Sequence, residues 1–501
     1  MREIIHIQAG TFANYVGTHF WNTQESYFTY YEDEDPIVRH DISFREGLIH
    51  NEPTLCPRLL LFDRKVNFGS LAKTNRLADE NGEDEEESIL WDGNTVEYKQ
   101  EPVSKSQYHT HLEEMSEDTT EDAVGETTDA SIRYWSDFNR VFFSPRTVQM
   151  LPDVADWETT TGDWSVGQET FRRFDEENGL MEESLRLFIE ECDNFQGLQV
   201  IQDTSTFGSF IGSMLSSFRD EYPKNQALTF ALLSSTHTGH IDANSNPSVI
   251  NEAVNDALCL RALNELSDAT IPIYHPSHWP QGAWADNLKF DREKPYHTSA
   301  ILSAHIESAT LPLRLKGSSH DISALSNRIN WSSVRFGQLS GTLPVSSAQT
   351  FKNRLNFSTL SSHKQTEFSR EDVIRGFSTE NTKVYDDWCN LSPLRAPFYA
   401  CTTTPSYPLP TSFPPIFESQ YPRPLSKPVF SSLGAGTASS GMLSDYAKLI
   451  GRLSTKKKGI VIGLEDDELR ELANELWVLC DGYLGDGPDE KEEDAPGEDE
   501  T

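Results

Sequence analysis

The first residues of the chain combine a glycine with a backbone pattern that suits phosphate binding. Met1–Gln8 predicts a short buried strand, Gly10 a break after it, and Phe12–Trp21 a helix. A strand, a glycine turn and a helix start point backbone N–H groups at a phosphate. A single glycine after a strand is also an ordinary turn, so the pattern alone leaves both interpretations open.

Histidine and cysteine side chains are the candidate metal ligands of this sequence. His237 and His240 stand three residues apart, and on a helix their rings would share one face and could hold a metal ion. Gly239 and the surrounding Ser and Thr residues favour a surface loop, and His109 and His111 receive the same interpretation. The six cysteines are scattered without zinc spacing and indicate reduced core thiols in a cytosolic protein. No metal site is predicted. The sequence also has no nucleophile-elbow motif and no P-loop.

The length and net charge of the chain limit the classes of protein to which it can belong. The chain has 501 residues, enough for two or three domains, and a formal net charge of −37. An acidic surface repels phosphate backbones, so nucleic acid is excluded as a partner and basic protein surfaces are favoured. No apolar run approaches the roughly 20 residues that span a bilayer, so no membrane span is expected. The N-terminus shows no signal peptide and no Arg-rich presequence.

The pattern of apolar residues alternates between strands and helices in the first half, which predicts a doubly wound, mostly parallel sheet. We expect strands at Cys56–Asp63, Leu198–Ile201 and Gln226–Leu233, and helices at Leu180–Cys192, Ile211–Tyr222, Val249–Leu266 and Leu464–Leu484.

Segments of extreme composition interrupt these elements. The acidic segments 79–87 and 113–130 and the acidic tail 486–501 cannot bury enough apolar surface to order, so they predict mobile insertions and a disordered tail. The Pro-rich stretch 405–428 predicts an irregular loop, and the glycine-rich Gly434–Met442 a flexible turn.

Four segments resemble tubulin, in tubulin order. They are "MREIIHIQAG", "PRLLLFD", "IEECDNFQGLQV" and "SSFRDEYP". Three further segments, "SIRYWSDFNRVFFSPRTV", "FIEECDNFQGLQVIQD" and "PYHTSAILSAHIESATLPLRL", resemble the Misato proteins, which are tubulin-related proteins of mitochondrial distribution and inheritance. The similarity runs from residue 1 to at least Leu315, and more loosely beyond it.

The resemblance implies a tubulin-like α/β fold in three parts. Residues 1–246 form a nucleotide-binding-type domain with acidic insertions near 79–130. Residues 247–445 form a core helix and a second, smaller α+β domain, and residues 446–501 a C-terminal helix and tail.

The resemblance also locates a GTP site, and this chain departs from it. In the first loop Gly10 and Asn14 match tubulin, whereas Thr11 and Tyr15 replace two glutamines. In the second loop, "DTSTFGSFIG" (Asp203–Gly212) is shorter and has lost most of the glycines that let a backbone approach phosphates.

The other residues of the implied site match tubulin only in part. Thr206 and Gly208 remain as candidates in the second loop, while Asp203 adds a negative charge beside the phosphates. Asp63 matches a tubulin Asp near Mg²⁺, but Lys65 stands where tubulin has a Glu. Asn251 resembles the Asn that reads guanine, and it is also a plausible helix-capping or exposed residue. No segment matches the tubulin loop that supplies the catalytic acid, so no catalytic residue is assigned.

These observations favour a vestigial GTP site formed by Gly10, Thr11, Asn14, Asp63, Thr206, Gly208 and Asn251, in a non-catalytic protein. The resemblance implies a role in mitochondrial morphology and in partitioning of mitochondria and their DNA, with the protein in the cytoplasm and on the outer mitochondrial surface. Two alternatives stay open. One is a cytosolic accessory factor of tubulin or chaperonin machinery, and the other a weak GTP-binding protein or GTPase.

Overall fold

The computed structural model describes most of the chain outside the acidic segments. The described residues are 2–28, 35–49, 52–69, 71, 106–108, 110, 112, 131–151, 164–241, 245–330, 335–345, 353–360, 366–417, 425–455 and 463–484. The predicted acidic segments 79–87, 113–130 and 486–501 lie outside these residues.

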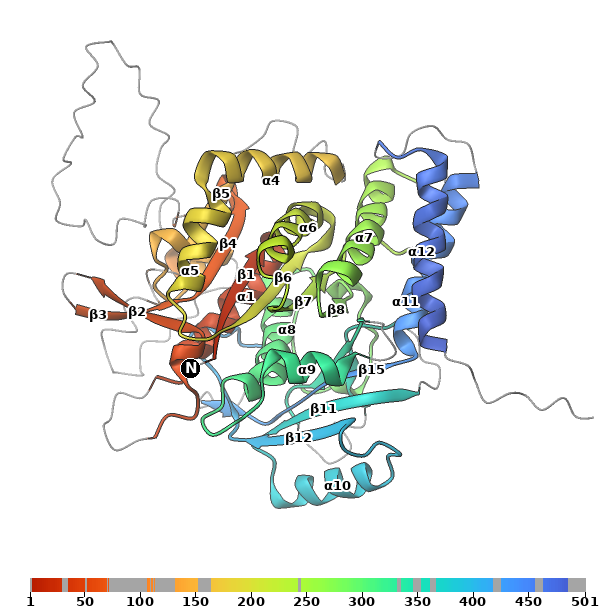
Figure 1. Ribbon diagram of the computed structural model, residues 1–501. Coiled ribbons are helices and arrows are strands. Elements are labelled where there is room, and N and C mark those ends of the chain that lie inside the picture. The colour runs from red at the N-terminus through yellow and green to blue at the C-terminus, as the bar shows by residue number, and fades with distance from the viewer. Residues whose placement is uncertain are drawn as a thin grey trace, which may run out of the picture.

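A six-stranded sheet forms the first half of the molecule, and all its strand pairs are parallel (Figure 1). This confirms the doubly wound prediction. The order is β5-β4-β1-β6-β7-β8, with β1 Glu3–Ala9, β4 Leu59–Arg64, β5 Val148–Leu151, β6 Phe195–Asp203, β7 Gln226–Leu232 and β8 Ala269–Ile273.

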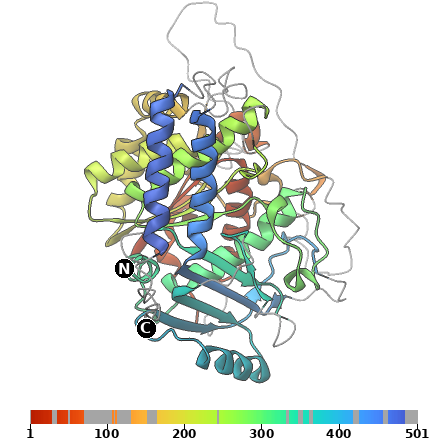
Figure 2. The same ribbon diagram turned by 90° about the vertical axis from the view of Figure 1, so that its right-hand side faces the viewer.

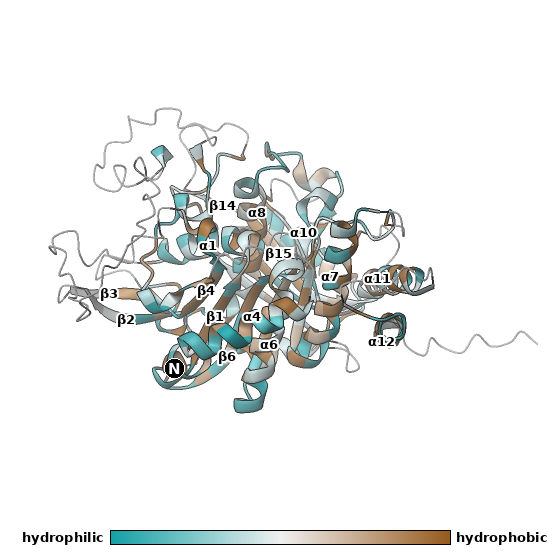
Figure 3. Cartoon of the chain, turned by 90° about the horizontal axis from the view of Figure 1, so that it is seen from above, coloured by the Kyte–Doolittle hydropathy of each residue, from teal (hydrophilic) through white to brown (hydrophobic). Residues whose placement is uncertain are grey.

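Helices cover both faces of this sheet because successive strand residues point to opposite sides. On β1, Ile5 and Ile7 pack on one face with the helices α4 to α7, while Ile4 packs on the other with α1 and α8. In Figure 3 the central strands are brown, and α4 and α6 above them carry teal residues. The helix bounds are α1 Thr11–Glu25, α4 Trp164–Asn178, α5 Arg186–Glu190, α6 Thr204–Glu221, α7 Pro247–Leu266 and α8 Pro295–Thr310.

Two predicted elements in this half differ in detail. The expected strand Cys56–Asp63 is two strands, because Arg58 leaves the hairpin of β2 (Phe44–Ile49) and β3 (Glu52–Pro57), donating its backbone N–H to Ser43, before β4 begins. The expected helix Leu180–Cys192 begins with a π-helical stretch, Leu180–Leu185, before α5.

A second, five-stranded sheet lies beside the first domain, in the order β10-β9-β15-β11-β12 (Figure 1). Helix α8 is buried along its whole length from Tyr296 to Thr310 because it packs between α1 and the second sheet, against β9, β11 and β15. The elements of this half are α9 Ile322–Ile329, β9 Gln338–Thr342, β10 Leu355–Asn356, β11 Glu367–Arg375, α10 Thr379–Asn390, β12 Tyr399–Thr404, β13 Tyr407–Pro408, β14 Ser426–Lys427 and β15 Val429–Gly436.

The prediction of a flexible turn at Gly434–Met442 is wrong. Gly434 and Gly436 are the last residues of β15, and a Cβ at either would press on the backbone of the neighbouring strand segment at Ser369 or Thr366. Glycine at these two positions therefore lets the neighbouring backbone come close to β15. Helix α11 (Ala438–Thr455) follows directly.

The C-terminal part contains two helices where one was expected. Helix α11 packs along α12 (Asp466–Leu484), and Figure 2 shows the pair side by side. Both also pack against α7. The expected boundary at residue 445 therefore falls inside α11, and the expected boundary at 246 precedes β8, the last strand of the first sheet. None of the helices in the described ranges combines the length and apolar content needed to cross a bilayer.

Candidate functional site

The order of the parallel sheet marks one place where a ligand would be expected. From β1 the chain moves to β4 on one side, and from β6 it moves to β7 on the other. Ligands of open α/β sheets bind at the carboxyl ends of the strands that flank such a reversal. Here these strand ends are Ala9, followed by Gly10, and Asp203.

Gly10 shapes the first of these ends. Its φ of 108° lies in a region that favours glycine, and its N–H donates to the carbonyl of Phe62 at 3.1 Å. Helix α1 begins at the next residue without a side-chain cap and without an acidic residue in its first turn. Its free N–H groups form the positive end of the helix dipole, which suits an anion.

The anion at this helix end is the side chain of Asp203. One carboxylate oxygen accepts the backbone N–H of Phe12 at 2.9 Å, and the other accepts that of Ala13 at 2.9 Å. Although Asp203 precedes α6, its carboxylate does not cap α6. Partial burial raises the pKa of Asp203 to about 7, and the nearby Asp63 adds to this, while the two N–H donors oppose it.

Asp63, at the end of β4, is fully buried and held by neutral donors. Its carboxylate accepts from Asn67 at 2.7 Å, from Asn14 at 3.1 Å and from the indole of Trp135 at 3.1 Å. The hydroxyl of Thr11 lies 3.4 Å away and is itself the acceptor of a bond from Asn67. Burial raises the pKa of Asp63, and these hydrogen bonds oppose the rise.

Gly10, Thr11, Asn14 and Asp63, four of the residues that the resemblance assigns to a GTP site, thus lie together. Tyr15 is buried, packs on Phe138 with ring centres 5.7 Å apart, and donates to the carbonyl of Arg133. Lys65 is exposed in the turn after β4.

The expected loop at Asp203–Gly212 is wrong, because α6 starts immediately after β6 at Thr204. Thr206 therefore lies in the first turn of a helix. Phe207 is buried in the core, and a Cβ at Gly208 would press on Cys259 of α7. Gly208 serves helix packing here, where a phosphate loop would need an open backbone.

Asn251 lies in the second turn of α7. One turn later, Asn255 makes the contact with the start of α6 by donating to the carbonyl of Ser205 at 2.8 Å. The next residue, Asp256, is fully buried and accepts from Ser234 and from Tyr446 of α11. Burial raises the pKa of Asp256 to about 6, against these hydrogen bonds.

Guanosine triphosphate does not fit these residues. Asp203 takes the N–H groups that would face a phosphate, and α6 replaces the second loop. Asp63 and Asp203 have no ion-pair partner within the described part of the chain, so a triphosphate would meet one buried and one partly buried carboxylate and no fixed cation.

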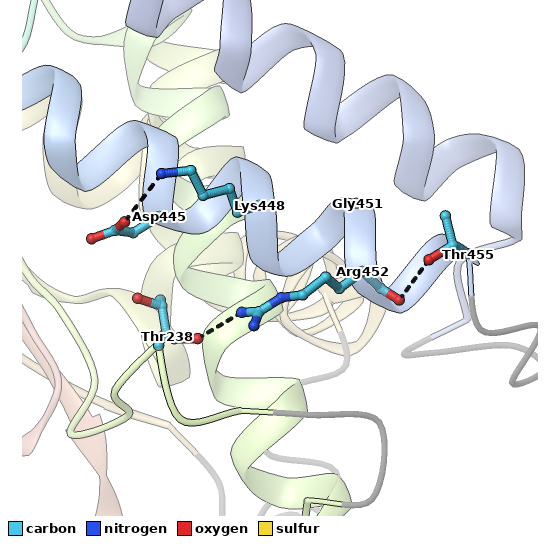
Figure 4. Close-up of a pocket in the computed structure, with 7 residues that line it drawn as sticks. Thr238, Asp445, Lys448, Gly451, Arg452 and Thr455 are labelled. Atoms are coloured by element: carbon cyan, nitrogen blue, oxygen red, sulfur yellow. Dashed lines mark hydrogen bonds and ion pairs between the residues drawn. The ribbon is translucent and has the colours of Figure 1, made fainter.

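Two pockets lie elsewhere in the described part of the chain. One, of about 510 Å³, lies between α11 and the loop after β7 (Figure 4). There Arg452 donates to the carbonyl of Thr238 at 3.0 Å, and Lys448 stands 4.0 Å from Asp445. The other, of about 530 Å³, lies between α7 and α12. Neither is lined by Gly10, Asp63 or Asp203.

The histidines show no metal site among the described residues. His237 and His240 lie in a loop, as predicted, with their rings stacked 4.4 Å apart. His109 and His111 lie outside the described residues.

Sequence reasoning missed the partners of the two carboxylates. A signal for Asp203 was present, because Asp before "TSTF" is a common residue type at a helix start and predicts α6 from Thr204. No local pattern indicated Trp135, which reaches Asp63 across 72 positions of the chain.

Two family models match parts of this chain. Residues 2–114 match the family model described as Misato Segment II tubulin-like domain, and residues 124–315 match that of a tubulin domain. The chain is 38% identical to Protein DML1 of Gibberella zeae over 330 residues, which cover 65% of this chain and 63% of that protein. It is 31% identical to Protein dml1 of Schizosaccharomyces pombe over 332 residues, which cover 64% of this chain and 67% of that protein. The chain thus spans a little under two thirds of the first curated relatives it matches.

Proposed function

We propose that this chain, which belongs to the Misato family of tubulin-related proteins, acts as a non-catalytic tubulin-like protein in the partitioning and distribution of mitochondria and mitochondrial DNA. The fold is tubulin-like. The mitochondrial role is the one that the family resemblance implies. The non-catalytic character is supported by the structure at the switch point, which is the place at the carboxyl ends of β1 and β6 where the strand order reverses.

The observation that carries the proposal is the start of α6 at Thr204 directly after Asp203. A nucleotide pocket needs a backbone loop that bends around phosphates. Here that backbone forms a regular helix whose first turns are packed on α7 through Phe207 and Gly208. Opening it would expose buried apolar surface, so the packing that stabilises the fold opposes a phosphate loop.

A nucleotide-content assay tests the non-catalytic part. The full chain is purified without added nucleotide, denatured, and the supernatant is separated by anion exchange, with tubulin treated identically as the positive control. We expect no stoichiometric guanine nucleotide, and no melting shift when GTP and Mg²⁺ are added. A stoichiometric nucleotide, or a saturable shift of several degrees, would overturn this part.

Depletion in cells that make the protein tests the mitochondrial part. We expect fragmented or unevenly distributed mitochondria and unequal inheritance of mitochondrial DNA, reversed equally by the wild type and by Thr11→Ala. Thr11 is one of the residues that the resemblance assigns to the nucleotide site, so rescue by its variant separates a scaffold from a nucleotide-dependent protein. Normal mitochondria after depletion would contradict the proposal.

The site of action is proposed to be the cytoplasm and the outer mitochondrial surface. Protease treatment of intact mitochondria should therefore degrade any bound protein, whereas full protection would contradict this location. Recovery of chaperonin and tubulin with the purified chain, together with normal mitochondria after depletion, would favour the accessory-factor alternative.

A further inference from the structure

Asp203 stands in an unusual relation to the two helices that it could cap. It directly precedes α6, where a carboxylate normally accepts N–H groups of its own helix. Its carboxylate bonds instead to Phe12 and Ala13 of α1, nearly 200 positions away. Helix α1 offers nothing of its own, since Gly10 has no side chain and the first turn has no acidic residue.

The place of this contact coincides with the ligand position of the fold. Gly10 follows β1 and Asp203 ends β6, the two strands between which the sheet order reverses. In parallel α/β sheets, the helix N-terminus at this point receives the anionic group of a ligand. Gly10 leaves room for the carboxylate, because a Cβ there would collide with the Asp203 side chain.

We propose that the Asp203 carboxylate is a built-in anion that takes the place of a ligand phosphate and holds β1–α1 and β6–α6 together without any ligand. The inference rests on the proposed loss of nucleotide binding and goes beyond it. The carboxylate of Asp203 replaces the phosphate, and its contact at the switch point stabilises the packing of the two strand–helix units. Removing the carboxylate should uncover an anion site of phosphate chemistry.

A phosphate titration tests the inference on the full chain. Wild type, Asp203→Ala and Asp203→Asn are melted in phosphate-free buffer and with inorganic phosphate at constant ionic strength. We expect Asp203→Ala to melt lower than the wild type and to regain about 2–4 °C, saturably, with phosphate. The wild type and Asp203→Asn should not respond, because a side chain still fills the position.

The exposed Asp220 on α6 provides the control, since Asp220→Ala changes the same charge without touching α1. An equal phosphate shift in the wild type, or an unresponsive Asp203→Ala, would overturn the inference.

A second measurement covers the case in which Asp203→Ala does not fold. Hydrogen exchange of the Phe12 and Ala13 amides is compared in the wild type and in Asp203→Asn, which keeps the side-chain volume but has one oxygen acceptor. We expect at least one amide to exchange about fivefold faster or more in the variant. Unchanged protection would overturn this inference alone, whereas bound guanine nucleotide in the wild type would overturn the proposed function.

Discussion

Carboxylates that are buried or partly buried occur in two settings in this molecule. At the switch point, Asp63 and Asp203 accept hydrogen bonds from neutral N–H and amide donors. Between the two sheets, Glu307 of α8 is also buried, but Arg375 of β11 donates to it at 2.7 Å and Arg314 lies 3.6 Å away. Gln24 of α1 and Tyr27, which lies just after that helix, complete this second group by donating to Glu307, each at 3.0 Å.

The two settings differ in the charge of the groups that hold the carboxylate. Neutral donors around a carboxylate are the donors that a bound anion would use, so the switch point keeps the recognition geometry of a ligand site and fills it from within. The Glu307 group has its own cations and joins α1, α8 and β11, which makes it an internal tie between domains. A buried charge with a cation is costly to break, and one with neutral donors is sensitive to pH.

Breaking the ion-paired group should have the largest effect. Glu307→Gln leaves Arg375 and Arg314, each 1% exposed, without their counter-charge. We expect a loss of about 3–5 kcal/mol in the free energy of unfolding, measured by urea denaturation. The control is Glu169→Gln on α4, whose ion pairs with Arg172 and Arg173 are exposed to solvent and should contribute far less than the buried group. Equal effects of the two variants would contradict the comparison.

Closing the space beside Asp203 should have the next largest effect. Gly10→Ala is expected to cost about 1–3 kcal/mol, because the backbone is in a glycine region and the new Cβ collides with Asp203. Gly451→Ala in α11 is the control, since nothing lies within 4 Å of its added Cβ, and it should leave stability unchanged or raise it slightly.

A double variant sharpens this test. If the collision with the carboxylate contributes to the cost, Gly10→Ala should destabilise Asp203→Ala less than it destabilises the wild type. Strictly additive effects in thermal melting would mean that backbone conformation alone explains the requirement for Gly10.

The pH dependence of stability tests the setting of Asp203. The pKa of Asp203 is raised from 3.8 to about 7 in the folded protein, so between these values the folded state binds more protons than the unfolded state. Its contribution to stability therefore falls as pH rises from about 4 to 7 and is constant above that range. We expect the melting-temperature advantage of the wild type over Asp203→Asn to shrink across this window. An advantage that grows with pH would contradict the raised pKa.

Asp220→Asn is the matched control for this pH series. Its carboxyl is exposed and lies on α6, so the variant removes the same charge without touching the Phe12 and Ala13 amides.

What the sequence could predict follows the range of the interactions. Local patterns placed β1, the glycine turn, the start of α1 and the core helix α7, because each depends on residues within one or two turns. They failed at Gly434, where a glycine is needed for close approach of a strand that is distant in sequence. The same limit applies to the candidate site. Asp203 reaches α1 only because β1 and β6 are neighbours, and that pairing is a property of the whole sheet.

The smallest expected effect concerns two asparagines of α7. Asn251 is assigned to the GTP site by the resemblance, whereas Asn255 makes the contact with α6 in the structure. Asn251 lies on α7 without a side-chain hydrogen bond to another described residue, whereas Asn255 is buried and bonds to Ser205 at the start of α6. We expect Asn255→Ala to cost about 1 kcal/mol in unfolding free energy and Asn251→Ala to stay within about 0.5 kcal/mol of the wild type. Because the two positions share one helix and one residue type, each variant is the control for the other. A larger loss for Asn251→Ala, abolished by added guanine nucleotide, would show that the switch point still binds a ligand and would break the contrast between a filled site and an internal tie.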